Sequence, residues 1–264
     1  PAGVERQARV PAGAEAIPNP VGTAPGFSLR IGRAAFFFLP GVPAEFQRMA
    51  EEAVLPRLAA MAGGARSPAP RTLRTFGLAE SEVSAKVEAA LSEAAVRHAL
   101  APHVYGAGDE TFAAALGRLL AERGATLALA ESCTGGLASA MVTEVPGASR
   151  YFLASAVCYS DEAKERLLGV RGETLRLHGA VSAETAREMA KRVREIAGAT
   201  FGLGITGIAG PTGGTPDKPV GTVHVALADT SGIEARSYRF PLDRARVRQI
   251  AAYAALDLLR RRLQ

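Results

Sequence analysis

The sequence has no tryptophan, and only two cysteines and four histidines among its 264 residues. Two cysteines, Cys133 and Cys158, are too few for a disulfide-stabilised fold, and this usage predicts a reducing, cytoplasmic location. There is no CxxC pair and the histidines are scattered, which argues against a structural zinc site. No stretch approaches the roughly 20 apolar residues of a membrane-spanning helix, so we expect no membrane partner. The chain begins at Pro1 without a visible signal peptide, which suggests a piece of a longer protein.

An excess of charge of one sign is also lacking. Lysine and arginine number 31 and the acidic residues 26, giving a net charge of +5. Such a modest excess suits an anionic small molecule as well as it suits nucleic acid. The one basic run, Arg260–Arg262, fits the end of a helix. No nucleic-acid recognition motif is present, so we expect no sequence-specific nucleic-acid partner.

Composition divides the chain into three zones. Residues 1–65 contain turn signals, an apolar run typical of a buried strand (34–39) and a helical pattern (44–62). Residues 66–105 open with a linker-like Gly/Pro stretch and continue with an Ala- and Glu-rich segment, 81–100, that can be helical. Residues 106–264 alternate strand and helix signals, which predicts a mixed α/β sandwich. The expected strands are 126–130, 152–159, 201–206 and the pair 222–227 and 233–240, and the expected helices include 111–123, 182–196 and 243–263.

The segment Glu131–Gly136 is the densest chemical candidate, because it lies where a strand ends and a helix begins. A serine there, Ser132, can act as a nucleophile while neighbouring backbone amides hold an oxyanion. The alternative is a simple helix cap in which the glycines serve only the turn. Cys133 is better interpreted as a small buried hydrophobic residue than as a reactive thiolate, because no histidine is placed to activate it.

A second strand-to-helix junction, Tyr159–Lys164, follows the next expected strand. If both junctions share one edge of the sheet, a desolvated Lys164 can act as general base toward Ser132. The alternative is a solvated lysine in the first turn of a helix.

Two further segments suit an anionic ligand. The glycine-rich loop 206–215 lacks the spacing of a nucleotide P-loop but permits close approach of its backbone, unless it is a plain surface turn. Arg244, Arg246 and Arg248 offer guanidinium groups, of which one or two can face a pocket, or all can be solvated. His178 is expected in a loop before a helix, in a structural or solvent-facing role.

Six motifs in order carry a family resemblance. The segments 130–136, 145–149, 159–164, 179–182, 205–214 and 218–222 together resemble the C-terminal domain of the CinA family of nicotinamide mononucleotide deamidases, over residues 106–264. The resemblance implies a three-layer α/β sandwich with a mixed sheet. Segments 6–14, 19–26 and 39–45 resemble part of the molybdopterin-binding-like domain of CinA proteins, and 76–81 resembles the start of their small KH-like domain.

The resemblance implies an amidohydrolase that converts nicotinamide mononucleotide into nicotinic acid mononucleotide and ammonia, in pyridine nucleotide recycling. Ser132 matches the nucleophile, Lys164 its general base, and Tyr159 a residue that orients the pair. The implied substrate-binding residues are Cys133, Thr134, Gly135, Thr206, Gly207 and, at the phosphate, Arg246. No metal or other cofactor is needed for this step, the expected partner is a small-molecule nucleotide, and we expect a homodimer.

The chain departs from the family pattern in two places. The first half of the molybdopterin-binding-like domain is absent. The middle domain passes from near Leu91 almost directly to Val104, so about 50 residues of the usual length of a small domain are missing there. The resemblance also implies an alternative, a divalent-metal-dependent ADP-ribose pyrophosphatase activity of the N-terminal domain. A third alternative is a non-catalytic nucleotide-binding protein related to competence.

Overall fold

A computed structural model describes residues 9–62, 70–88, 90 and 92–264. The chain divides into two compact units, residues 1–70 and 71–264, each with a core of its own. The boundary expected after residue 65 falls within 63–69, outside the described residues. Residues 71–105 belong to the same unit as the C-terminal sandwich.

The first unit is a small antiparallel sheet with a helical segment. Its strands follow the order β1-β2-β3, and the helical segment runs through α2, a π-helical turn η1 and α3. The π turn ends two residues before Pro56, which has no N–H to continue the α-helical ladder. A strand and a helical segment are present where they were expected, but the strand β3 is not buried, because its residues alternate between exposed and half-buried. The bounds are β1 Glu15–Ile17, β2 Gly26–Ile31, β3 Ala34–Phe38, α2 Pro43–Met49, η1 Ala50–Val54 and α3 Leu55–Met61.

The second unit begins with a short two-stranded sheet. Strand β4 (Leu73–Thr75) pairs antiparallel with β5 (Val104–Ala107), and helices α4 (Glu80–Val87) and α5 (Glu93–Leu100) lie between them in sequence. The helical segment expected over 81–100 is therefore two helices rather than one. Residues 89 and 91 lie outside the described part of the chain.

A mixed five-stranded sheet forms the centre of the second unit, in the order β10-β9-β8-β6-β7. The middle strand β6 runs parallel to β7 and β8, whereas β9 is antiparallel to β8 and β10 is antiparallel to β9. The mixed sheet and the pairing of the last two strands are both as expected. The bounds are β6 Leu127–Glu131, β7 Phe152–Val157, β8 Phe201–Gly207, β9 Thr222–Ala228 and β10 Ile233–Arg239.

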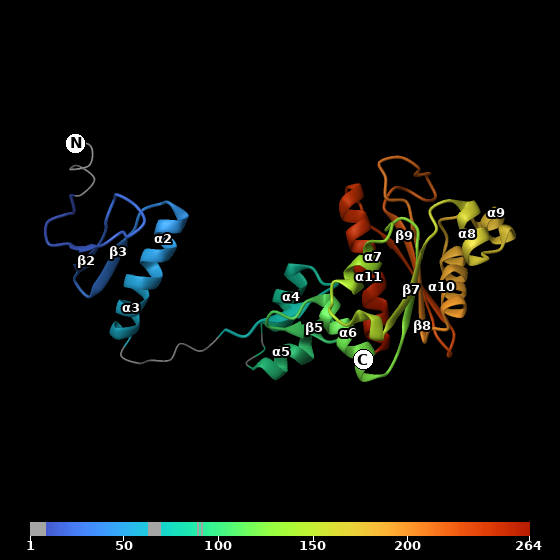
Figure 1. The fold of residues 1–264 in the computed structure, drawn as a ribbon, viewed down its shortest axis with the longest axis horizontal. Helices are drawn as coiled ribbons and strands as arrows, with labels where there is room; N and C mark the ends of the chain where they lie inside the picture. Colours follow the sequence, from blue (N-terminus) through green and yellow to red (C-terminus); the bar gives the residue numbers. More distant parts are fainter. Residues whose placement is uncertain (1–8, 63–69, 89, 91) are drawn as a thin grey trace. The chain divides into compact units, whose positions relative to one another are not determined.

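Helices cover both faces of this sheet, which completes the three-layer α/β sandwich (Figure 1). One face packs against α6, α7 and α11 through a core of leucine, isoleucine, valine and alanine side chains. The other face packs against α8, α9 and α10. The bounds are α6 Phe112–Glu122, α7 Leu137–Thr143, α8 Asp161–Leu168, α9 Gly172–His178, α10 Ala183–Ala197 and α11 Arg244–Arg262, with a 3-10 turn η2 at Ala148–Arg150.

Two glycines in β8 explain how closely α10 approaches the sheet. A Cβ atom at Gly202 would overlap the carbonyl oxygen of Ala190, and one at Gly204 would overlap that of Ala186. Because both oxygens belong to the backbone of α10, no side-chain movement can relieve the overlap. The glycines therefore set the spacing between this helix and the strand.

Helix α11 also joins the small sheet to the sandwich. Arg260 is fully buried; its guanidinium is ion-paired to Asp257 at 2.7 Å and donates to the carbonyl oxygen of Pro102 at 2.7 Å. A buried arginine needs such partners, because an unpaired charge in the interior is costly. Within the described ranges, no helix combines the length and hydropathy required to cross a bilayer.

Candidate active site

The carboxyl ends of the three parallel strands meet at one edge of the sheet. Glu131 at the end of β6 is in register with Val157 of β7 and with Ile205 of β8. The ladder continues one residue further, because the Ser132 N–H donates to Ile205 (2.9 Å) and the Cys158 N–H donates to Glu131 (2.8 Å). The two junctions singled out in the sequence therefore share one edge, which meets the condition for Lys164 to act on Ser132.

A tight turn carries Ser132 from β6 into α7. The N–H of Gly135 donates to the carbonyl oxygen of Ser132 at 3.0 Å, and Gly135 and Gly136 have φ of +60° and +91°. Residues with a Cβ avoid this left-handed region, which explains both glycines. Ser132 is 7% exposed, and in the described part of the chain its hydroxyl makes no hydrogen bond.

Glu131 holds the start of α7 in place. Its fully buried carboxylate accepts hydrogen bonds from the N–H groups of Gly136 (3.0 Å), Ala138 (3.1 Å) and Ser139 (2.8 Å), and from the Ser139 hydroxyl. A negative charge at a helix N-terminus is favourable, because the first N–H groups of a helix have no partner within it. Sequence reasoning assigned Glu131 no role, although its place directly before Ser132 was a usable signal.

Lys164 is the most unusual group of the site. Its side chain is 1% exposed, and Nζ lies 3.4 Å from the Tyr159 carbonyl oxygen, 3.5 Å from that of Ser160 and 3.7 Å from Asp161 Oδ1. Burial lowers the pKa of this amine below its ordinary value, and the nearby Asp161 carboxylate partly opposes the shift. The interpretation as a solvated first-turn lysine is wrong, because the side chain turns inward over the end of β7.

The two cysteines behave as buried hydrophobic residues. Cys133 is 4% exposed, and burial raises the pKa of its thiol to about 12. Burial likewise raises the pKa of the Cys158 thiol. Gly207 lies against Cys133, since a Cβ at that glycine would come within 3.1 Å of the cysteine sulfur. Cys133 is therefore a thiol rather than a thiolate near neutral pH, which agrees with its interpretation as a small packing residue.

Thr134 and Thr206 are both buried, but their hydroxyls differ. The Thr206 hydroxyl donates to the carbonyl oxygen of Ala180 at 2.7 Å, which ties the strand end to the loop before α10. The Thr134 hydroxyl has no partner within the described residues. The Thr134 carbonyl oxygen accepts from Arg248 Nη2 at 2.9 Å, so that arginine connects α11 to the turn that carries Ser132.

The arginines at the start of α11 divide into two groups. Arg244 donates to the carbonyl oxygen of Gly210 (2.7 Å) and to the Tyr159 hydroxyl (2.8 Å), and Arg248 lies one turn later. Arg246 points elsewhere: its side chain is 72% exposed and its Nε lies 3.4 Å from Asp243. The structure therefore joins Arg244 and Arg248 to the site loops, and it does not bring Arg246 to them.

Tyr159 meets the lysine through its backbone rather than its ring. Its side chain is 58% exposed and its hydroxyl contacts Arg244, whereas its carbonyl oxygen accepts from Lys164. His178 ends α9 instead of lying in a loop, which corrects the sequence expectation. The His178 carbonyl oxygen accepts from Lys218 Nζ at 2.6 Å, which ties the glycine-rich segment after β8 to this helix end.

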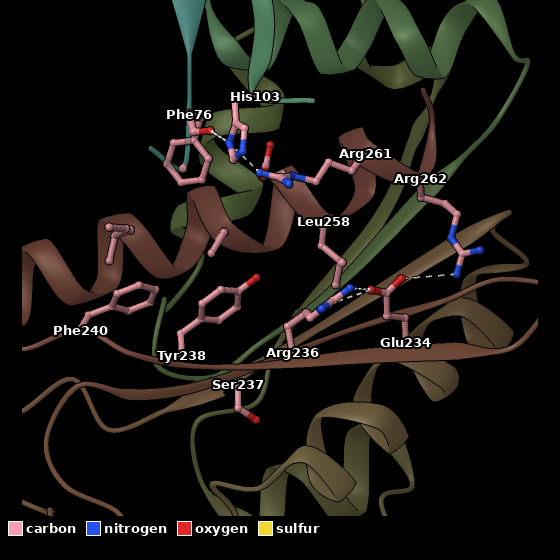
Figure 2. Close-up of a pocket in the computed structure, with 14 residues that line it drawn as sticks. Phe76, His103, Glu234, Arg236, Ser237, Tyr238, Phe240, Leu258, Arg261 and Arg262 are labelled. Carbon is pink, nitrogen blue, oxygen red and sulfur yellow. Dashed lines mark hydrogen bonds and ion pairs between the residues drawn. The ribbon is translucent and has the colours of Figure 1, made fainter. Parts of the chain in front are cut away.

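A groove of about 860 Å³ lies apart from these residues, between β10, α11 and the segment around Phe76 and His103 (Figure 2). Tyr238 and Phe240 stack on its floor at a ring-centroid distance of 5.4 Å. Its arginines are paired with acids, as in the 2.7 Å ion pair of Arg236 with Glu234. None of the candidate catalytic residues lines this groove.

Comparison with known proteins places the sandwich in a family. The family model described as the CinA C-terminal domain matches residues 109–263. A CinA-like protein from Geobacter metallireducens is 45% identical over 295 aligned positions, which cover 98% of this chain and 71% of that protein. A CinA-like protein from an Anaeromyxobacter species is also 45% identical, over 97% of this chain and 71% of its own length.

Solved structures agree with this match. A CinA superfamily protein from Klebsiella pneumoniae is 38% identical with a TM-score of 0.55, and covers 56% of this chain and 92% of its own. A competence/damage-inducible protein from Agrobacterium tumefaciens is 38% identical with a TM-score of 0.53, over 55% of this chain and 91% of its own. The Geobacter alignment has more positions than the 264 residues here, so that relative contains residues within the matched span that this chain lacks.

Proposed function

Since this chain belongs to the CinA family, we propose that it is an amidohydrolase in which Ser132 is the nucleophile and Lys164 the general base. One observation carries the proposal: a buried lysine with a lowered pKa lies at the same sheet edge as a serine whose hydroxyl makes no hydrogen bond among the described residues. A neutral amine can accept a proton, whereas an ordinary lysine near neutral pH cannot. The helix-cap interpretation of Ser132 does not account for a buried lysine at the same sheet edge.

The reaction can be written with these groups alone. Lys164 takes the proton of the Ser132 hydroxyl as Oγ attacks the amide carbon. We propose the backbone N–H groups of Cys133 and Thr134, or that of Gly207, as the donors to the oxyanion. Collapse breaks the carbon–nitrogen bond, and the Lys164 ammonium returns its proton to the departing ammonia. Water then attacks the acyl-serine with Lys164 again as base, which releases the acid and restores the serine.

We propose nicotinamide mononucleotide as the substrate, as the resemblance implies. Its phosphate needs a cation, and Arg244 and Arg248 are the arginines that contact the site loops. Arg246, which the resemblance implies at the phosphate, would have to leave Asp243 to reach them. Both cysteines are free and buried, and we propose the cytoplasm as the place of the reaction.

Ammonia release from nicotinamide mononucleotide, with and without EDTA, tests the proposal. Ser132→Ala and Lys164→Ala should each lower kcat by about 10³-fold or more without unfolding the protein. Ser231→Ala is a matched control, because this exposed serine lies in the turn between β9 and β10. Turnover that survives in Ser132→Ala would refute the acyl-enzyme step.

No observation favours the two alternatives. Across the residues that the structure describes, no group of three or more histidine, cysteine or acidic side chains could hold a metal, so nothing singles out a pyrophosphatase site. Turnover of ADP-ribose with a divalent metal that is indifferent to Ser132→Ala would support the pyrophosphatase. Binding of the nucleotide without any turnover would support the non-catalytic protein.

A further inference from the structure

The groove between β10 and α11 lies outside the candidate active site, and its lining divides into two ends (Figure 2). One end carries aromatic rings, from Phe76, Tyr238 and Phe240, and the other carries the charged side chains of Glu234, Arg236 and Arg262. Its volume of about 860 Å³ is in the range of small-molecule sites, about 300–1,000 Å³. Such a lining fits a ligand with a planar ring at one end and an anionic group at the other.

The aromatic end has ring surface and a hydroxyl to offer. Tyr238 and Phe240 lie on the same face of β10, with their rings stacked at 14° and only partly buried against the core. The Tyr238 hydroxyl points toward the groove and makes no hydrogen bond within the described ranges (Figure 2). Burial raises the pKa of this phenol, so it stays protonated near neutral pH and can donate a hydrogen bond.

The charged end has an excess of positive charge. Among the described residues, four arginines share three carboxylates, namely Arg236, Arg260, Arg261 and Arg262 with Asp229, Glu234 and Asp257. Arg262 has the weakest partners: its nitrogens lie 3.5 Å from Asp229 and 3.6 Å from Glu234, and it makes no hydrogen bond in the part of the chain that the structure describes. Its guanidinium is therefore available to an anion, which it can bind with two parallel hydrogen bonds.

The contact between Arg261 and His103 also leaves a polar group of the groove without a partner. Arg261 Nη2 lies 3.2 Å from His103 Nδ1, and the same ring nitrogen lies 3.0 Å from the carbonyl oxygen of Phe76. One ring nitrogen cannot donate to the carbonyl and accept from the guanidinium at the same time. Either Arg261 lacks an acceptor at Nη2 or the carbonyl lacks a donor, and a polar ligand in the groove can supply the missing partner.

We propose that the groove binds a nucleoside monophosphate, with its base against Tyr238 and Phe240 and its phosphate at Arg262. Tyr238 and Glu234, the acid beside Arg262, are four residues apart on β10, which is about 13 Å along the strand. An aromatic ring that carries its carboxylate directly is too short to reach both ends, whereas base, ribose and phosphate in line are long enough. The Tyr238 hydroxyl can then donate to the ribose between them. No residue of this groove takes part in the reaction proposed above, so the two proposals can fail independently.

Equilibrium dialysis of the full chain with each of the common ribonucleoside monophosphates tests the proposal. At least one should bind with a dissociation constant below about 1 mM. The matching nucleoside and inorganic phosphate should each bind about 10-fold more weakly or worse, because each lacks one of the two anchoring groups. Arg262→Ala and Phe240→Leu should each weaken binding of the nucleotide by about 10-fold, through loss of a charged hydrogen bond and of stacking. Arg239→Ala is the matched control, because this exposed arginine is on β10 but does not line the groove.

The proposal is overturned if none of these nucleotides binds, if both groove variants keep the affinity of the unaltered chain, or if the nucleoside or phosphate alone binds as tightly. A nucleotide whose binding is lost in Arg244→Ala and retained in Arg262→Ala occupies the candidate active site instead, which also overturns it. Circular dichroism of each variant establishes that it is folded before its affinity is interpreted.

Discussion

Arg244 Nη2 lies 2.8 Å from the hydroxyl oxygen of Tyr159, although 85 residues separate the two in sequence. The same guanidinium donates to the carbonyl oxygen of Gly210, so one side chain bridges the loops that follow β7 and β8. The bridge ties the first turn of α11 to both loops.

We predict that Arg244→Ala raises KM for the nucleotide substrate by about 10-fold or more, and that Arg246→Ala changes it by less, because Arg244 contacts the site loops and Arg246 does not. Arg244→Lys should restore little, since an ammonium cannot reproduce the planar fork that contacts both loops. Steady-state kinetics of the three variants checks this. A larger effect of Arg246→Ala on KM would mean that Arg246 binds the phosphate, as the resemblance implies.

The pH dependence of turnover should report Lys164. The base must be neutral, so kcat should fall as pH drops through the lowered pKa of this amine. Asp161 raises that pKa, so Asp161→Asn should move the acid limb of the profile to lower pH. Glu162→Gln, on the same turn and paired with Arg166, is the control and should leave the limb in place. If the acid limb of the kcat profile did not move in Asp161→Asn, a group other than Lys164 would be responsible for it.

Lys164 should also leave a mark on stability. Its pKa is lower in the folded than in the unfolded chain, so between the two values the unfolded state binds more protons, and the free energy of unfolding rises with pH. Lys164→Met removes this rise, so the variant should gain stability relative to the unaltered chain most at low pH. Urea unfolding at several pH values measures the difference, and parallel pH curves for the two proteins would contradict it.

Glu131→Gln should weaken both the fold and the site. The amide cannot accept as strongly from four donors as the carboxylate does, so we expect a loss of about 1–3 kcal/mol in the free energy of unfolding. Because this acid positions the Ser132 turn, kcat should fall more than KM rises. Glu122→Gln, exposed at the end of α6, is the matched control. Thermal unfolding with kinetics would show an unaffected kcat if Glu131 were purely structural.

Gly204→Ala should lower the free energy of unfolding by about 1–3 kcal/mol, because its Cβ would overlap the backbone of α10. Gly41→Ala is the control, since a Cβ there meets no atom within 4 Å. Chemical denaturation measures both variants. If Gly204→Ala were as stable as the unaltered chain, α10 would have to move away from β8 without a loss in the free energy of unfolding.

The elements that the sequence predicted are those with strong local signals. The apolar runs of β6 and β8 and the Ser182 cap of α10 depend on neighbouring residues alone, and all three are present. Helix α9 was missed, because its seven residues have no clear apolar period. Whether the two junctions share one sheet edge stayed a condition, because the order of strands in a sheet depends on pairing between distant segments.

The site itself was less predictable, because its contacts are long-range. Nothing in the spacing of Lys164 separates a buried amine from a solvated one; the difference arises where the side chain meets the end of β7. Likewise, the sequence does not distinguish the three arginines at alternating positions. In the structure, Arg244 and Arg248 are the ones that contact the loops after β8 and β6. Motif order identified the family, and only the fold identifies which arginines reach the loops.

The backbone hydrogen bond from Ser132 to Ile205 has a consequence for how this edge meets its ligand. The serine continues the ladder of the sheet, so its main chain is fixed when the protein folds. The conformational entropy of that residue is then lost once, during folding, and not again at each encounter with a small molecule. A ligand that binds at this edge therefore meets a backbone that is already ordered. Only the long side chains of the neighbouring arginines have to change conformation to bind it.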